Sequence, residues 1–585
     1  MTAENSPTAS RVTDQARTPA LRAAGRRDVA ETHKPPGSAA AVKVAPETSE
    51  DAFVALPDEP AQPLLRLPLS TGPSVWIRRI AGMPWPLAVV LGIQATLSVR
   101  LVSSNSAFLD EATYIWAGHL EWAHWLHGAP IPAYPTYFSG APVIYPPLAA
   151  MADSFGGLAG ARVLSTVFML GTTTTLWGTA SRLFGRRAAV AATVLFVLLG
   201  PTEYLGAFAT YDAMALFLLT AGAWLLVVAR DRDDSSLLLL AGTITLVAAN
   251  ATKYATALFD PTAAALGALA IVDKRGVKAA AGRFGCIAAC TVALASGILA
   301  IGGSWYLVGV ESTTTARHSG TTAASQVLID AARWVWLPCA IAVAGVALAA
   351  FSQRGRATTL LLCVLAGGGA LVPLEQARIH TTVSLTKQVD FGAWFAAIAA
   401  GYAVAWLSRT SRHAWLRAAI ALPILVAAAY PAWLAGPPQA LSFMRSWANT
   451  TKPVAILRPL VRKYPGPLLA EDYDVFGYYL RKQVRWQDWS NTWYFTYKRK
   501  TAQSAPGTGV QPTGLGAFAA AVRARYFSLI VLDFGDTAAA DHSVTAAIRR
   551  YGDYHVVAEL PYSDSHGTGK YTVWARLPVS HGIEQ

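Results

Sequence analysis

The feature that most constrains this chain is a series of apolar stretches, each about 17 to 25 residues long, separated by short clusters of charge. A helix of that length crosses the hydrocarbon core of a bilayer. The composition agrees, because 53% of the residues are apolar and only 14% are charged; a soluble globular protein has about 25% charged residues. The sequence therefore predicts a polytopic α-helical membrane protein.

We place about eleven membrane-spanning helices, with bounds taken from the ends of the apolar stretches. They are expected at 84–102, 158–179, 188–204, 211–229, 236–251, 255–272, 280–303, 327–350, 357–374, 389–407 and 416–436.

The loops between these spans carry a topology signal. The basic loops all fall on one side, and they are "SRLFGRR" (181–187), "ARDRDD" (229–234), "DKRGVK" (273–278), "SQRGR" (352–356) and "SRTSRHAWLR" (408–417). Basic loops remain in the cytoplasm, so the N-terminus is predicted to be cytoplasmic and the end of the chain extracytoplasmic. These loops also explain much of the net charge of +13, and no nucleic-acid partner is expected.

The pattern divides the chain into regions. Residues 1–75 lack sustained apolar periodicity, which predicts a disordered cytoplasmic tail. Residues 76–436 form the transmembrane region, with a long first outer loop at 103–157. Residues 437–585 are expected to form a small extracytoplasmic α/β domain. Alternating apolar residues indicate its strands at 526–534, 554–560 and 570–576, and helix-like stretches lie near 513–525 and 541–550.

Two adjacent acids, Asp110 and Glu111, follow the first predicted span. A carboxylate near hydrocarbon is costly unless it is paired or functional. The loop that follows is rich in aromatic residues and proline, including Trp116, Tyr137 and Tyr145, which favours interfacial helices that hold a lipid-borne substrate. An ordinary aromatic belt with solvated acids is the alternative.

A further acid, Asp212, follows Tyr211 at the outer start of a later span, and Tyr211 joins Trp116, Tyr137 and Tyr145 as a candidate contact for the acceptor or the lipid. Asp212 has two interpretations: a second functional acid on the outer side, or a helix cap that accepts backbone N–H bonds.

Several basic residues fall on the predicted outer face, where the positive-inside rule disfavours them. They are Lys253, Arg317, His318, Arg378, His380 and Lys387. A bound phosphate is a natural partner for Lys, Arg and His side chains together. Solvated loop charges, with lysine side chains extended to the interface, are the alternative.

Together, the outer acids and cations suit one chemistry. Transfer of a sugar from a polyprenyl phosphate needs a carboxylate to take the proton of an acceptor hydroxyl. It also needs cations to stabilise the phosphate that leaves. The isoprenoid tail stays in the bilayer, so such a site must lie at the interface.

The motif "FLDEATY" (108–114), followed by 145–196 and 200–227, resembles the GT-C superfamily of membrane glycosyltransferases. The likeness is to the branch that contains protein O-mannosyltransferases and the lipid A aminoarabinose transferase. "LLAEDYDVFGYYL" (468–480) is similar to the extracytoplasmic domain of some bacterial members. The resemblance implies that Asp110 is the catalytic base, that Asp212 corresponds to a further outer acid, and that the sugar is transferred with inversion.

The sequence leaves some points open. A divalent metal held by Asp110, Glu111 and Asp212 is an alternative, as in the oligosaccharyltransferases. The acceptor is a glycan, a lipid or a protein, and the Ala- and Arg-rich composition suits the plasma membrane of a bacterium. Two other functions remain: a secondary transporter, whose site should lie near the bilayer midplane, and a membrane scaffold or sensor with an outer binding domain.

Overall fold

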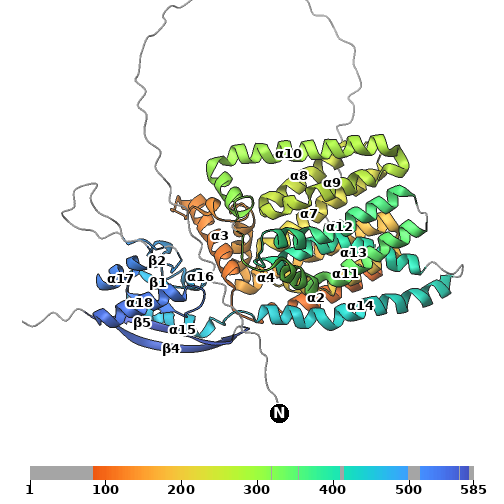
Figure 1. The fold of residues 1–585 in the computed structure, drawn as a ribbon. Helices are drawn as coiled ribbons and strands as arrows, with labels where there is room; N and C mark the ends of the chain where they lie inside the picture. The colour runs from red at the N-terminus through yellow and green to blue at the C-terminus, as the bar shows by residue number, and fades with distance from the viewer. Residues whose placement is uncertain are drawn as a thin grey trace, which may run out of the picture. The chain divides into compact units, whose positions relative to one another are not determined.

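The computed structural model describes residues 84–232, 234–317, 319–352, 355–408, 414–493, 495–497, 514–565 and 567–578 (Figure 1). The tail predicted at 1–75 and the candidate residue His318 lie outside these ranges.

Between Trp85 and Met444 the regular elements of the described residues are helices. They are α2 (Trp85–Val99), α3 (Leu109–His127), α4 (Tyr145–Phe184), α5 (Arg186–Val197), α6 (Gly200–Leu205), α7 (Tyr211–Val228), α8 (Ser236–Thr252), α9 (Asp260–Leu269), α10 (Val272–Thr313), α11 (Ala324–Phe351), α12 (Arg356–Arg378), α13 (Leu385–Leu407) and α14 (Ala414–Met444).

Each predicted span overlaps helical structure. Within the described ranges, 6 helices are long and apolar enough to cross a membrane, namely α4, α7, α10, α11, α12 and α13. Helices α2 and α8 are apolar but shorter. The chain is therefore a polytopic membrane protein, whereas the number of eleven crossings stays a prediction.

Two predicted spans are interrupted near a proline. The stretch 188–204 breaks after Val197, and α6 begins at Gly200 with Pro201 in its first turn. The stretch 255–272 begins as a 3₁₀ helix (Tyr254–Phe259), and α9 starts at Asp260, directly before Pro261. Proline has no N–H and a fixed φ, so it is tolerated in the first turn of a helix but disrupts its interior.

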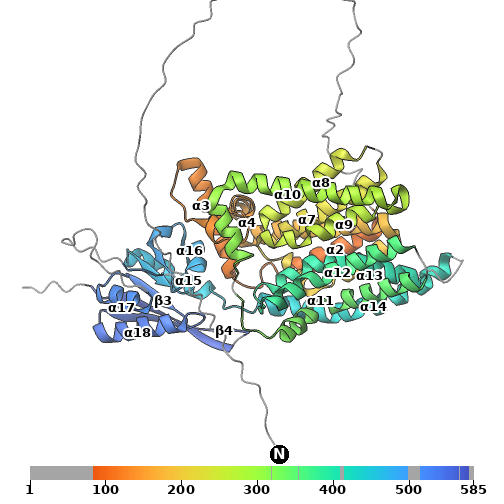
Figure 2. The same cartoon turned by 45° about the horizontal axis from the view of Figure 1, so that its top comes forward.

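Helix α13 lies at the centre of the bundle. Nearly all residues of its apolar stretch are buried, and α5, α11 and α12 pack against it. Figure 2 shows α11 and α12 beside α13. Glycine permits a close approach of α13 to α5: a Cβ atom on Gly401 would lie 2.3 Å from the carbonyl oxygen of Ala188. Such contacts between small residues are typical of helix packing in membranes.

Basic loops meet at one end of the bundle. Lys274 pairs with Asp231 at 2.9 Å, and Arg275 donates to the carbonyl of Arg232 at 2.9 Å. Arg182 also lies 4.0 Å from Asp231. Three of the predicted cytoplasmic loops therefore lie together, as the positive-inside pattern requires.

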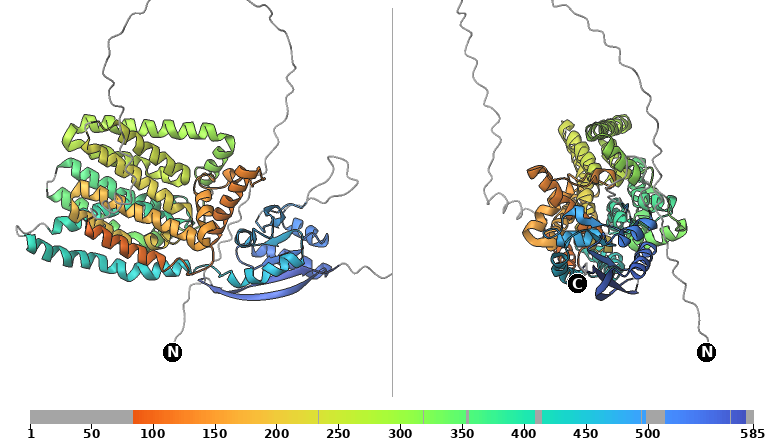
Figure 3. Two further views of the ribbon diagram at one scale, coloured as in Figure 1. Left: turned by 180° about the vertical axis from the view of Figure 1, so that it is seen from behind. Right: turned by 90° about the vertical axis from the view of Figure 1, so that its left-hand side faces the viewer.

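The C-terminal region contains a five-stranded sheet of order β2-β1-β3-β5-β4. The strands are β1 (Leu468–Ala470), β2 (Trp489–Ser490), β3 (Leu529–Leu532), β4 (Tyr554–Asp564) and β5 (Gly567–Arg576). Strands β1, β2 and β3 are parallel, whereas β5 is antiparallel to β3 and β4. The three strands predicted from the sequence are β3, β4 and β5; the long pair β4 and β5 is visible in Figure 3.

Helices cover both faces of this sheet, because successive side chains of a strand point to opposite sides. Ile530 and Leu532 of β3 pack with α17 (Leu515–Arg523) and α18 (Ala538–Tyr551). Leu529 and Val531 pack with α15 (Thr451–Lys463) and α16 (Tyr473–Leu480). The second core continues into α3 through Ile115 and Trp116. Helix α14 runs past residue 437 to Met444, and the predicted domain boundary at 437 stays a prediction.

Candidate active site

The first turn of α3 carries both acids of the outer-loop motif, Asp110 and Glu111. Acidic side chains at a helix N-terminus interact favourably with the helix dipole. Glu111 is fully buried. Its two oxygens accept the backbone N–H groups of Phe108 at 3.0 Å and Ala209 at 2.8 Å. Glu111 therefore ties the start of α3 to the segment before α7.

Arg162 of α4 neutralises Glu111. Two guanidinium nitrogens lie 2.8 and 2.6 Å from the two Glu111 oxygens. The guanidinium also donates to the carbonyls of Val102, Asn105 and Ser106. A bidentate pair of this kind constrains geometry as well as charge. It holds the backbone that carries Asp110.

Asp110 has a different environment from its neighbour. Its side chain is 29% exposed, and it forms an ion pair with the Nζ atom of Lys387. Lys387 is buried in the first turn of α13, where the helix dipole disfavours a cation. Ser384, which precedes α13, has a positive φ of 63°. The dipole of α13 therefore disfavours the Lys387 ammonium group at this position, and the ion pair with Asp110 offsets that cost.

A second ion pair lies close to the first. Asp212, in the first turn of α7, pairs with Lys253, which follows α8, and both are buried. Thr210 Oγ1 donates to the other Asp212 oxygen at 3.0 Å. Lys387 is close enough to interact electrostatically with Asp212 as well as Asp110. We call Asp110, Asp212, Lys253 and Lys387 the carboxylate–lysine cluster.

Aromatic rings line this cluster. The Tyr211 hydroxyl accepts a hydrogen bond from the Tyr114 hydroxyl at 2.7 Å and also contacts Ser139 Oγ. Lys253 Nζ lies 5.3 Å from the centre of the Tyr211 ring, and Lys387 Nζ lies 5.8 Å from that of Phe208. Cations over aromatic faces at this range gain electrostatic stabilisation. The lysines are thus held in place by rings as well as by acids.

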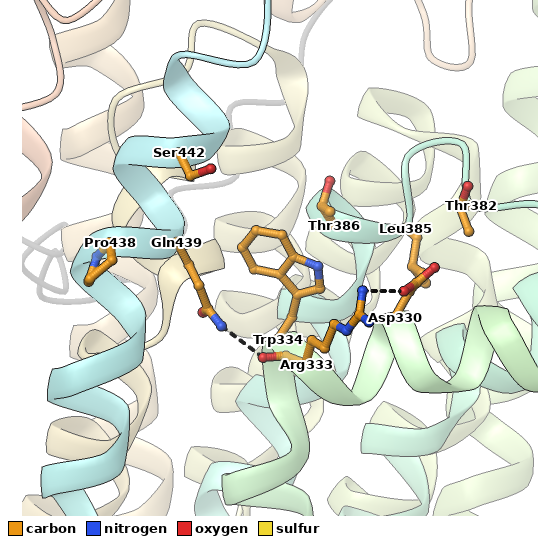
Figure 4. A pocket seen from close by; sticks show the side chains of 9 residues that line it. All are labelled: Asp330, Arg333, Trp334, Thr382, Leu385, Thr386, Pro438, Gln439 and Ser442. Atoms are coloured by element: carbon orange, nitrogen blue, oxygen red, sulfur yellow. Dashed lines mark hydrogen bonds and ion pairs between the residues drawn. The ribbon is translucent and has the colours of Figure 1, made fainter. Parts of the chain in front are cut away.

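A cavity of about 590 Å³ lies beside the segment that leads into Lys387. Figure 4 shows Trp334 of α11 between Gln439 of α14 and Thr386. Arg333, the neighbour of Trp334, pairs with Asp330 at 3.0 Å. The lining is Asp330, Arg333, Trp334, Thr382, Leu385, Thr386, Pro438, Gln439 and Ser442. The cavity therefore combines three apolar side chains, those of Trp334, Leu385 and Pro438, with six polar or charged ones.

Solved structures identify this architecture. The chain is similar to ArnT from Cupriavidus metallidurans, in a crystal structure bound to undecaprenyl phosphate, with a TM-score of 0.53 and 14% sequence identity. The match covers 87% of this chain and 99% of that one. The apo oligosaccharyltransferase of Archaeoglobus fulgidus matches with a TM-score of 0.51 and 13% identity, over 85% of this chain and 75% of that one. This chain has the GT-C fold. No family model matches the sequence, and no curated protein matches it.

The GT-C fold brings only part of the predicted cation set together. Lys253 and Lys387 belong to the cluster, whereas Arg378 is exposed and pairs with Glu375 of its own helix at 2.7 Å. Arg317 donates to the carbonyl of Val383 at 3.3 Å, and the exposed His380 ring lies 3.1 Å from the carbonyl of Thr322. The sequence indicated the side of the membrane for these residues but not which of them converge.

The predicted lipid-loop aromatic residues also differ among themselves. Tyr145 and Tyr211 are buried, and Tyr137 is 48% exposed. Trp116 is buried against α16, where a Cβ atom on Gly477 would lie 2.3 Å from its ring. Trp116 therefore faces the C-terminal region, and its expected contact with a lipid or an acceptor stays a prediction.

Polar contacts strengthen the same junction. Asp153, in the first part of α4, accepts hydrogen bonds from the Tyr478 hydroxyl at 2.5 Å and from Arg481 at 2.7 Å. The ring of His119 lies 2.7 Å from the same carboxylate. The loop that carries Asp110 is thus bonded to α16 and the residue that follows it.

The sequence analysis missed two residues of this site. Arg162 is a single arginine within an apolar span, which was an available signal. Asp474 of α16 lies near Thr113 and close enough to Asp110 for their charges to repel. Burial, together with the charges of Asp472 and Asp110, raises the pKa of Asp474 to about 7. Only the tertiary contact between α3 and α16 reveals it.

The alternative of a divalent metal in this cluster does not fit the geometry. Each of the three acids already pairs with a cation of the chain: Asp110 with Lys387, Glu111 with Arg162 and Asp212 with Lys253. A metal would have to displace these partners and leave buried cations unpaired, which is costly.

Proposed function

We propose that this protein is a membrane glycosyltransferase that moves a sugar from a polyprenyl-phosphate donor to an acceptor hydroxyl. The contact between Asp110 and Lys387, 277 residues apart in the chain, carries the proposal. One group can accept a proton and the other can hold a phosphate. The fold shared with an ArnT structure that contains undecaprenyl phosphate supports a donor of this class.

Asp110 is the general base in this proposal. It is the partly exposed acid of the cluster, with a side chain that is 29% exposed. The oxygens of Glu111 are occupied by Arg162 and by backbone N–H groups, and Asp212 is buried against Lys253. Glu111 and Asp212 therefore act as positioning residues.

The reaction is a direct displacement at the anomeric carbon. The acceptor oxygen forms a bond to that carbon while its proton passes to the Asp110 carboxylate. The bond from the anomeric carbon to the phosphate oxygen breaks, and its electron pair leaves with the polyprenyl phosphate. Attack opposite the leaving group inverts the configuration. Lys387 stabilises the charge that develops on the phosphate.

The ion pair suggests an order of events. In the donor-free protein Lys387 neutralises Asp110. An incoming phosphate competes for the same ammonium group, and Asp110 then becomes a more available proton acceptor. Donor binding therefore prepares the base, which limits unproductive chemistry before the donor arrives.

The cavity beside Thr386 is the proposed entry for the lipid phosphate. It places Arg333 and the aromatic face of Trp334 next to the segment that ends at Lys387. An apolar wall suits the first isoprene units, and a cation at the rim suits the phosphate. We place the site and the C-terminal α/β region on the extracytoplasmic face of a bacterial plasma membrane, with the N-terminus in the cytoplasm.

The transporter alternative has less support. A transporter site is expected near the bilayer midplane on broken helices. The charged cluster lies instead at helix ends, in the first turns of α3, α7 and α13 and just after α8.

Substitution of Asp110 tests the proposal. The full chain in proteoliposomes is given labelled polyprenyl-phosphate sugars and acceptor membranes, and release of polyprenyl phosphate is measured. Asp110→Asn should lower the turnover number by about 10² to 10⁴, because loss of a general base has that effect. Asp231→Asn, an exposed acid in the predicted cytoplasmic loops, is the control. Full transfer by Asp110→Asn would exclude Asp110 as the base.

A further inference from the structure

A group of acids lies at one edge of the C-terminal sheet, apart from the carboxylate–lysine cluster. Glu471 directly follows β1 and Asp533 directly follows β3, and these two strands are parallel neighbours. Carboxyl ends of parallel strands meet at the same edge of a sheet. Asp541, from the first turn of α18, joins them there.

These acids are close enough to share one ion. One carboxylate oxygen from each of Glu471, Asp533 and Asp541 lies within 4.8 Å of the other two. Metal–oxygen distances of about 2.1 to 2.6 Å allow such separations around a single cation. We call these residues the carboxylate triad.

The surrounding loop orders the triad but does not neutralise it. Glu471 accepts the N–H groups of Thr537 at 2.6 Å and Gly535 at 3.2 Å. Asp541 Oδ2 accepts the N–H of Phe534 at 3.0 Å. In the part of the chain that the structure describes, no lysine, arginine or histidine forms an ion pair with any triad member.

Asp541 provides the second, independent observation. Its side chain is 0% exposed, and its Oδ1 atom has no hydrogen-bond partner among the described residues. The Oδ1 atom of Asp533 is also buried and without a hydrogen-bond partner among the described residues. Buried carboxylate oxygens without a donor are expensive, so a ligand that supplies positive charge would relieve a real cost.

We propose that the carboxylate triad binds one hard divalent cation, of which Ca²⁺ is the best fit. The donor set contains only oxygen, which favours Ca²⁺ or Mg²⁺ over softer metals. Ca²⁺ accepts irregular carboxylate arrangements, whereas Mg²⁺ demands near-octahedral geometry and keeps much of its water.

The site has a consequence for the outer loop. Glu471 lies three residues before Asp474, which is close enough to Asp110 for their charges to interact. A cation that fixes Glu471 also fixes the start of α16 and the position of Asp474. The cation site itself does not depend on the proposed transferase activity.

Thermal unfolding of the full chain in detergent tests the proposal directly. Protein stripped with EDTA is titrated with CaCl₂ and, separately, with MgCl₂, and calorimetry counts the bound ions. Ca²⁺ should raise the Tm saturably by at least about 2 °C, with one ion per chain, since selective binding to the folded state stabilises it. Absence of saturable binding at millimolar CaCl₂ would overturn the proposal.

Variants locate the ion. Asp541→Asn and Asp533→Asn should each weaken the Ca²⁺ response by at least about tenfold, because each removes a charged ligand. Asp533→Asn also removes a repelling charge, so its metal-free Tm should not fall, and this variant remains informative if Asp541→Asn does not fold. Glu559→Gln, an exposed acid on β4, is the matched control and should respond like the native chain. An unchanged response in both triad variants would refute the assignment.

Discussion

Asp110 and Glu111 are neighbours in one helical turn, yet their surroundings give them different roles. Glu111 is enclosed by Arg162 and backbone donors, and Asp110 reaches a lysine from another helix. Adjacent positions in a helix point about 100° apart, so one side chain can face the core while the next faces a cavity. The two acids of the motif therefore have separate environments, and in the proposed mechanism Glu111 holds the turn while Asp110 acts as the base.

Loss of Arg162 should destabilise the protein strongly. Arg162→Met leaves Glu111 buried without its cation, and breaking a buried pair costs about 3 to 5 kcal/mol. The double variant Arg162→Met with Glu111→Gln should recover part of this loss, because the uncompensated charge is gone. Thermal unfolding of the single and double variants measures both effects. Strictly additive losses would show that the two side chains are not coupled.

The carboxyl of Asp474 should make stability depend on pH. Its folded pKa is about 7, and an unfolded aspartate has a pKa of about 3.9. Between these values the folded state holds the extra proton, so this group's contribution to stability falls as the pH rises from about 4 to 7. Asp474→Asn stays neutral throughout. Its stability relative to the native chain should therefore rise with pH by at most about 1.4 kcal/mol per unit and level off above pH 7. A difference that is constant from pH 5 to 8 would contradict this environment for Asp474.

At the scale of the elements, the contact between α3 and α16 joins the helix that carries Asp110 to the C-terminal region. Trp116 lies against Gly477, and Asp474 of the same helix reaches Thr113. Because Asp110 lies in α3, a change in how α3 and α16 pack should shift the position of the Asp110 side chain.

Gly477→Ala tests this junction. Its new Cβ atom would lie 2.3 Å from the Trp116 ring, and overpacking of this kind costs about 1 to 3 kcal/mol. Gly516→Ala, in α17, meets nothing within 4 Å and is the matched control. It should be neutral or stabilising by up to about 1 kcal/mol. Thermal unfolding compares the two variants; equal Tm values would show that Trp116 can move aside.

At the scale of the whole molecule, the sequence predicted the helices and strands better than the tertiary contacts between them. Apolar length located the helices, and alternation located β3, β4 and β5, because both patterns are local. The pair Asp110 and Lys387 could be placed on one side of the membrane, since charge bias sets topology. Arg378 and His380 were predicted on the same side of the membrane, yet they lie outside the carboxylate–lysine cluster. No sequence pattern singled out Asp474. Which side chains converge depends on long-range packing, which no local pattern contains.

The central claim is that Asp110 and Lys387 act together on one transfer step. A double-mutant cycle on kcat/KM for transfer from a polyprenyl-phosphate sugar tests it most directly, with Asp110→Asn, Lys387→Gln and their combination in proteoliposomes. Residues that act as a unit show strongly non-additive losses of kcat/KM. The kcat/KM of the double variant should therefore be only slightly lower than that of the less active single variant. Losses that multiply, or near-native transfer by either single variant, would contradict the account.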